Sequence, residues 1–160
     1  MEDRLKAVAA IFDSNAKLFR GTMADMTETA WFHRPGDANH LAFLAMHLVG
    51  ARHYTVKFSG GASTDPLEVY HGGARSIDST ARFPSVDEVS TAWDEVAPIL
   101  QSTLAGVSGE FLDQASGLPF PAPGPARLDA LTFLAQHEAY HLGQMALLRR
   151  ICGLPAPEWR

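Results

Sequence analysis

Two histidines spaced four residues apart are the feature of this sequence that most directly indicates chemistry. His137 and His141 lie near the C-terminal end of an apolar stretch with helical periodicity. Residues four apart lie on the same face of a helix, about 6 Å apart along its axis, so both imidazoles can hold one metal ion. A stable centre needs a third protein ligand, and His47 lies within a second apolar stretch of helical character. If the two helices pack together, three neutral imidazoles converge and leave metal positions open, as in catalytic rather than structural sites.

The alternative interpretation is that these histidines are core residues with hydrogen-bonded partners. For a lone histidine on an apolar stripe, that interpretation is the better one. Burying three imidazoles without a shared ligand, however, leaves several donors and acceptors in need of partners, whereas a metal satisfies one nitrogen on each ring. We therefore predict a divalent transition metal at His47, His137 and His141. Imidazole suits zinc, nickel, iron and copper, of which we take zinc and nickel as the leading candidates.

Two further histidines share the second apolar stretch. His40 precedes His47 by seven residues and lies on nearly the same face, but about 10 Å away, too far to share one ion. It could line the same cavity further along or sit in the first turn of the helix. His53 follows His47 by six residues and is expected to face elsewhere, because that spacing carries it well around the helix.

The run from His137 to His141 also matches the His-Glu-x-x-His pattern of zinc proteases, in which the glutamate is the general base. No histidine follows His141, and the sequence lacks a credible β-sheet for a substrate edge, which argues against a protease. Glu138 lies about 100° around the helix from His137. It could act as a base or orient a ligand, and a surface or interface carboxylate is an equal alternative. Gln144 lies near the same stripe and could hydrogen-bond a bound ligand or pack between helices. These two are the candidate catalytic residues.

Four long stretches with helical periodicity must position these residues. They run from about Asp3 to Met23, from Asn39 to Gly60-Gly61, from Ser85 to Gly106, and from after Pro125 to Gly153. Asn39 is a good N-cap residue, and Ser85 with Glu88 forms a capping box. Residues 59–84 are rich in Gly, Ser, Thr and Asp and are longer than a usual bundle loop, which indicates either a functional lid or a crossover connection. We predict an all-α fold, a four-helix bundle formed by a single domain over residues 1–160.

Composition narrows the class of protein. The chain has 160 residues, of which 46% are hydrophobic and 19% charged, an ordinary globular composition. Its net charge of −5 argues against nucleic-acid binding. No apolar run approaches the length of a membrane span, and no signal peptide is recognisable. The one cysteine, Cys152, cannot form an internal disulfide, which fits a reducing cytoplasm. We expect a cytoplasmic protein that binds a small molecule, with no nucleic-acid or membrane partner.

Two parts of the sequence resemble a known family. Segment 137–145 resembles the His-[Asp/Glu]-x-x-His-x-Gly-Gln signature of the DinB/YfiT-like proteins. Upstream, segments 31–35 and 44–50 resemble the family's Trp-x-x-Pro segment and its first histidine helix. The resemblance covers nearly the whole chain. It implies a four-helix bundle, typically a homodimer, that holds a divalent metal through His47, His137 and His141.

The resemblance also implies a class of activity. Some DinB/YfiT-like proteins are thiol-dependent enzymes that use mycothiol, bacillithiol or glutathione for S-transfer or isomerisation. The first hypothesis is therefore a metal-dependent transferase that uses a low-molecular-weight thiol as cosubstrate and acts on a small electrophile, with the metal as Lewis acid. Two alternatives stay open. One is a metal-dependent hydrolase with Glu138 as base, and the other is a non-enzymatic stress-response protein with a structural metal.

Overall fold

The computed structural model describes residues 1–71, 76–80, 82–119 and 121–159, except for the side chain of residue 71. In these residues the regular structure is helical, apart from one isolated β-bridge between Ala115 and Ala126. The four longest helices are α1 (Lys6–Met23), α3 (Leu41–Phe58), α5 (Val86–Ala105) and α7 (Arg127–Ile151). The shorter elements are η1 (Asp3–Leu5), α2 (Glu28–Phe32), α4 (Glu68–His71), η2 (Ile77–Ser79) and α6 (Gly109–Asp113). The predicted all-α fold is confirmed. Over the same residues, no helix combines the length and apolar character needed to cross a bilayer.

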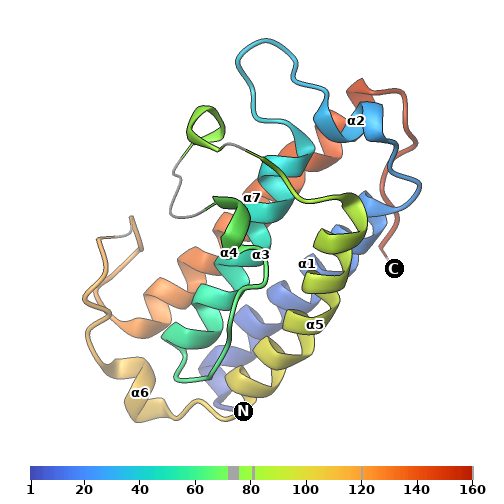
Figure 1. Cartoon of the computed structure of the whole chain (residues 1–160). Helices are drawn as coiled ribbons and strands as arrows, with labels where there is room; N and C mark the ends of the chain where they lie inside the picture. The colour runs from blue at the N-terminus through green and yellow to red at the C-terminus, as the bar shows by residue number, and fades with distance from the viewer. Residues whose placement is uncertain (72–75, 81, 120, 160) are drawn as a thin grey trace.

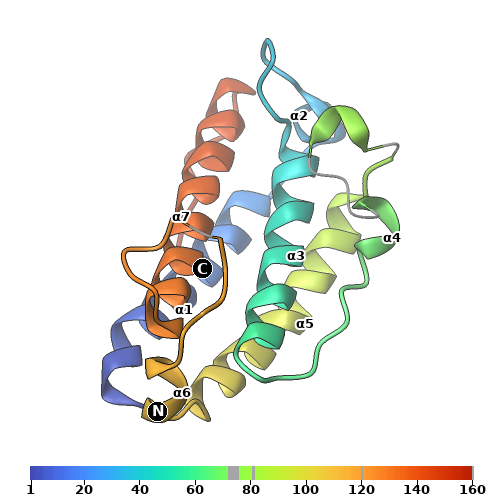
Figure 2. The ribbon, with the colours of Figure 1, turned by 90° about the vertical axis from the view of Figure 1, so that its left-hand side faces the viewer.

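The four long helices pack side by side in a ring. Helix α1 contacts α7, α7 contacts α3, α3 contacts α5, and α5 contacts α1. Figures 1 and 2 show α1 and α7 running in one direction along the bundle, while α3 and α5 run in the other. Because α3 and α5 are neighbours with the same direction, the chain between them must return along the length of the bundle. The described parts of residues 59–85 carry α4 and η2, while residues 72–75 and 81 of this segment lie outside the described residues. The predicted long connection is therefore a crossover between two parallel helices.

Side chains cap the N-termini of two long helices, and one of these N-caps differs from the predicted residue. The Ser85 hydroxyl accepts from the N–H of Glu88 at 3.2 Å, and the Glu88 carboxylate accepts from the N–H of Ser85 at 2.8 Å, which confirms the predicted capping box. At α3 the N-cap is His40, not Asn39, and its Nδ1 atom accepts from the N–H of Phe43 at 3.1 Å. An imidazole nitrogen can replace the usual side-chain oxygen because it also offers a lone pair.

A buried arginine ties all four long helices together. Arg52 in α3 donates from Nε and Nη2 to the two carboxylate oxygens of Glu138 in α7, at 2.7 and 2.8 Å. Its Nη2 atom also donates to the carbonyl oxygen of Phe12 in α1 at 2.8 Å. The guanidinium carbon lies 3.8 Å from the ring centroid of Trp93 in α5. The two charged side chains are only 1% and 2% exposed, so their bidentate geometry compensates for lost hydration. We call the Arg52–Glu138 pair, with these two further contacts, the helix clamp.

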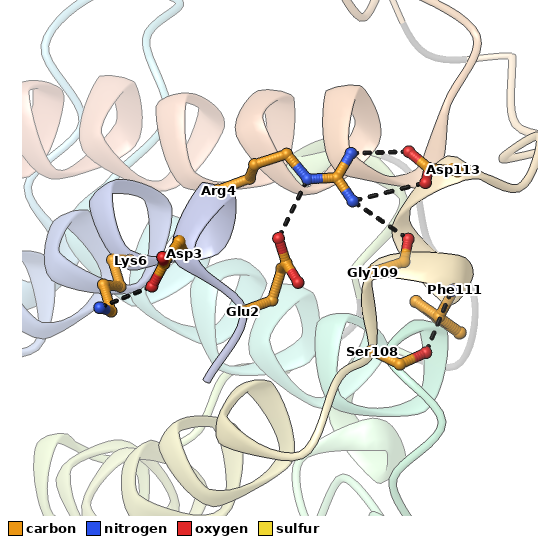
Figure 3. Close-up of polar contacts among 8 residues, drawn as sticks. All are labelled: Glu2, Asp3, Arg4, Lys6, Ser108, Gly109, Phe111 and Asp113. Carbon is orange, nitrogen blue, oxygen red and sulfur yellow. Dashed lines mark hydrogen bonds and ion pairs between the residues drawn. The ribbon is translucent and has the colours of Figure 1, made fainter.

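An arginine closes each end of the bundle. Figure 3 shows Arg4 of η1 reaching α6, where its guanidinium donates to the carboxylate of Asp113 and the carbonyl oxygen of Gly109. At the other end, the buried Arg149 of α7 donates to the carbonyl oxygens of Thr22 and Pro155. These contacts hold the end of α1 and the C-terminal tail against α7.

Removing one partner of the helix clamp should destabilise the fold strongly. In Glu138→Gln, Arg52 keeps its buried positive charge but loses the carboxylate that balances it, so we expect the free energy of unfolding to fall by about 3 kcal/mol. Urea denaturation followed by circular dichroism measures this loss. The control is Asp94→Asn, which breaks the exposed Arg20–Asp94 ion pair and should cost far less, because solvent screens that pair. Equal losses in the two variants would contradict the proposed importance of the clamp.

Candidate metal centre

Helices α3 and α7 bring the three predicted histidine ligands together. His47 comes from α3, and His137 and His141 lie one turn apart on α7. The Nε2 atom of His137 is 3.1 Å from the Nε2 atoms of both other rings. One ligand nitrogen from each ring lies within 4.8 Å of the other two. The contact between two helices with histidines on their apolar stripes therefore produces a compact cluster of three imidazoles.

The distances in this cluster fit a shared metal ion. Two nitrogens bound to one ion at about 2.1 Å, in tetrahedral or octahedral directions, lie about 3.0 to 3.4 Å apart. The Nε2 atom of His137 approaches two other Nε2 atoms, and one neutral ring nitrogen is either a donor or an acceptor, not both. A cation that accepts a lone pair from each ring satisfies all three nitrogens. The residues present therefore fit a divalent metal.

Burial favours the neutral form of the two α7 imidazoles. Burial lowers the pKa of His137 to about 4, and the neighbouring His141 adds to the lowering. The pKa of His141 is also lowered, chiefly by burial, against an opposing effect of its hydrogen bond with Gln144. Near neutral pH both rings keep a free lone pair, which is the form of histidine that binds metals.

Gln144 orients one of the ligands. Its Oε1 atom lies 2.7 Å from Nδ1 of His141, and its amide nitrogen donates to the Tyr140 hydroxyl at 3.2 Å. Because an amide oxygen only accepts, Nδ1 of His141 carries the hydrogen, and Nε2 is left with the lone pair for the metal. The Nδ1 atom of His137 is buried and has no such partner among the described residues. The hydrogen bond to His141 supports a positioning role for Gln144. That Gln144 also hydrogen-bonds a bound ligand stays a prediction.

Glu138 points away from the histidine cluster. It is 2% exposed, and both of its carboxylate oxygens accept hydrogen bonds from Arg52. It is not among the described residues that line the cavity next to the histidines. A general base must reach the proton that it removes, so this contact supports a structural role for Glu138 rather than the predicted catalytic one. The alternative of a surface carboxylate is wrong, because the side chain lies in the core.

A cavity of about 740 Å³ adjoins the three histidines. It extends along α3 from Asn39, just before the helix, to Lys57, with α7 on one side and the start of the crossover on another. Its lining is largely apolar, and the larger apolar side chains are those of Phe43, Met46, Phe133 and Leu134. All three histidines are partly exposed, so a small molecule in the cavity can reach them.

His53 lines this cavity, although its spacing from His47 predicts that it faces elsewhere. It lies about 9 Å further along the helix axis and well around the helix. The prediction is wrong because the cavity is wider than a single stripe of α3. The crossover folds against the helix there, and Ser63 Oγ lies 2.6 Å from Nδ1 of His53. Helical periodicity gives the angle of a side chain but not the position of a distant loop, so the sequence carried no signal for this residue.

Comparison with known proteins agrees with these observations. A family model described as the DinB superfamily matches residues 11–145, which include both histidine helices up to Met145. No curated protein matches the chain. The matched region contains His47, His137 and His141.

Gln144→Leu should weaken metal binding without abolishing it. The substitution removes the acceptor that holds the tautomer and orientation of His141, and loss of such a partner typically reduces metal affinity about tenfold or more. Competition with a chromophoric zinc chelator measures the change. Gln136→Leu, at an exposed position on the same helix, is the matched control and should bind zinc like the wild type. Unchanged zinc affinity in Gln144→Leu would show that this hydrogen bond does not support the site.

Proposed function

The chain belongs to the DinB superfamily, and from that premise we propose that it is a metal-dependent transferase that uses a low-molecular-weight thiol to modify a small electrophile. The observation that carries the proposal is the cluster of three imidazoles beside a largely apolar cavity. Three neutral ligands leave the full charge of a divalent ion, with zinc or nickel as the leading candidates, available to a fourth ligand. When bound, such an ion supplies Lewis acidity that lowers the pKa of a thiol.

The chain's own residues would bind the ion and orient one of its ligands. His47, His137 and His141 would hold the ion through their lone pairs, and Gln144 would fix the ring of His141. The largely apolar lining favours the carbon skeleton of the electrophile. In the reaction, the thiol releases its proton to solvent, and the sulfur forms a bond to an electrophilic carbon. The leaving group departs with the electron pair of the broken bond.

The helix clamp favours thiol transfer over hydrolysis. The hydrolase hypothesis uses Glu138 as its base, but Glu138 accepts hydrogen bonds from Arg52 through both oxygens and so is not free to take a proton from water. A thiol needs less assistance, because its ordinary pKa lies about seven units below that of water. A non-enzymatic stress-response protein with a structural metal is the remaining alternative.

We further propose that the protein works as a homodimer in the cytoplasm. Tyr140, Leu147 and Ile151 follow one face of α7, and each is more than half exposed, at 63%, 61% and 51%. Such an apolar stripe is typical of a contact between chains. The free thiol of Cys152 suits a reducing compartment. Sedimentation velocity would contradict the dimer if it gave the mass of one chain.

A conjugation assay tests the proposed activity. Protein loaded with zinc or nickel should join cysteine or glutathione to a small electrophile such as chlorodinitrobenzene, followed by absorbance of the thioether. Chelation or His141→Ala should return the rate to that of the thiol alone, because either change removes the activating ion. His33→Ala is the control, since His33 is exposed and lies outside the cluster. Ester hydrolysis without any thiol would support the hydrolase instead, and metal binding without turnover would support the binding protein.

A further inference from the structure

His40 caps the helix that carries the first metal ligand, and the capping bond fixes the state of its ring. Its Nδ1 atom accepts from the N–H of Phe43 at 3.1 Å, and a backbone N–H can only donate. Nδ1 therefore offers a lone pair, and the hydrogen of the neutral ring lies on Nε2. A second proton would have to bind Nδ1, the remaining basic position of the ring. Protonation of His40 and capping of α3 therefore exclude each other.

The surroundings of His40 disfavour a positive charge on its ring. The side chain is 7% exposed and packs edge to face against Phe32 of α2 and Phe83 at the end of the crossover, with centroid distances of 5.8 and 4.4 Å. Burial lowers the pKa of His40, and the positive charge of Arg34 acts in the same direction. Arg34 is the charged neighbour that affects this pKa among the described residues, and Asp78 of η2 holds it at 2.9 Å.

We propose that His40 is a pH-sensitive N-cap, which releases the first turn of α3 when its ring gains a proton. The added hydrogen would face the N–H of Phe43, so two donors would meet where one hydrogen bond stood. The positive ring would also face the positive end of the helix dipole. Phe43 and Met46 line the cavity beside the metal centre, so acid would loosen this wall just ahead of His47. The device needs neither metal nor turnover and goes beyond the proposed activity.

The effect has a definite direction in pH. Because the pKa of His40 is lowered in the folded chain, the unfolded chain binds this proton more readily, and acid favours unfolding. The contribution of His40 to stability is complete above the ordinary histidine pKa of about 6.5. It is lost as the pH falls from there toward the pKa of the folded chain.

His40→Asn separates the cap from its titration, because asparagine is a good N-cap whose side chain gains no proton in this range. Urea unfolding of the full-length protein as purified, followed by circular dichroism between about pH 8 and pH 5, compares this variant with the wild type. Relative to His40→Asn, the unfolding constant of the wild type should rise below about pH 6.5, by as much as about tenfold per pH unit. The titrations of the other histidines are common to both proteins and cancel in the comparison. His33→Asn, which changes an exposed histidine, is the matched control and should follow the wild type.

Nitrogen NMR of the wild type tests the same device without any variant. At about pH 8 the ring of His40 should carry its hydrogen on Nε2, as the bond from Phe43 requires. On acidification the amide signal of Phe43 should shift with the same midpoint as the His40 ring, below the ordinary value of about 6.5.

Three results would overturn the proposal. One is the same pH dependence of unfolding in the wild type and in His40→Asn. The others come from the wild type alone and hold even if the variant fails to fold. They are a ring hydrogen on Nδ1 of His40 near pH 8 and a midpoint of the His40 ring at or above about 6.5 in the folded protein. None of these measurements depends on thiol chemistry, so the switch and the proposed activity fail separately.

Discussion

The helix clamp is the interaction on which the geometry of the metal site depends. It joins α3 to α7, the same two helices that carry the three histidines. Glu138 lies between the two α7 ligands in sequence, and Arg52 follows His47 by five residues, so their bidentate contact fixes how far α7 is shifted along α3. A shift by one residue would move a ligand nitrogen by about 1.5 Å along the axis, which is enough to break a set of metal bonds.

The clamp also explains why a sequence pattern typical of zinc proteases has a different use in this chain. In the His-Glu-x-x-His pattern, the glutamate lies about 100° around the helix from the first ligand. Here that direction leads into the core toward Arg52 and not into the cavity. Whether a carboxylate in this pattern acts as a base therefore depends on the packing of its helix, which the pattern does not specify. The described side chains that line the cavity next to the histidine cluster do not include Glu138.

Much of this arrangement could be predicted because it depends on short-range periodicity. The long helices follow apolar stripes, Ser85 and Glu88 mark a helix start through contacts three residues apart, and the ligand histidines sit on the stripes themselves. The pairing of Glu138 with Arg52 could not be predicted. An arginine within an apolar stretch, as Arg52 is, indicates that it has a buried partner but not which residue that is. Periodicity does not tell which helices are neighbours or how they are shifted. The place of His53 depends on where the crossover packs, which only the folded chain determines.

Elemental analysis of the purified, untagged protein beside His137→Ala tests the metal centre most directly. We expect about one transition-metal ion per chain in the wild type and little in the variant, because two imidazoles alone do not complete a stable site. His33→Ala, which changes an exposed histidine, should keep its metal. A wild type that contains no metal and also fails to bind added zinc or nickel would contradict the metal centre, and with it the thiol-transferase proposal.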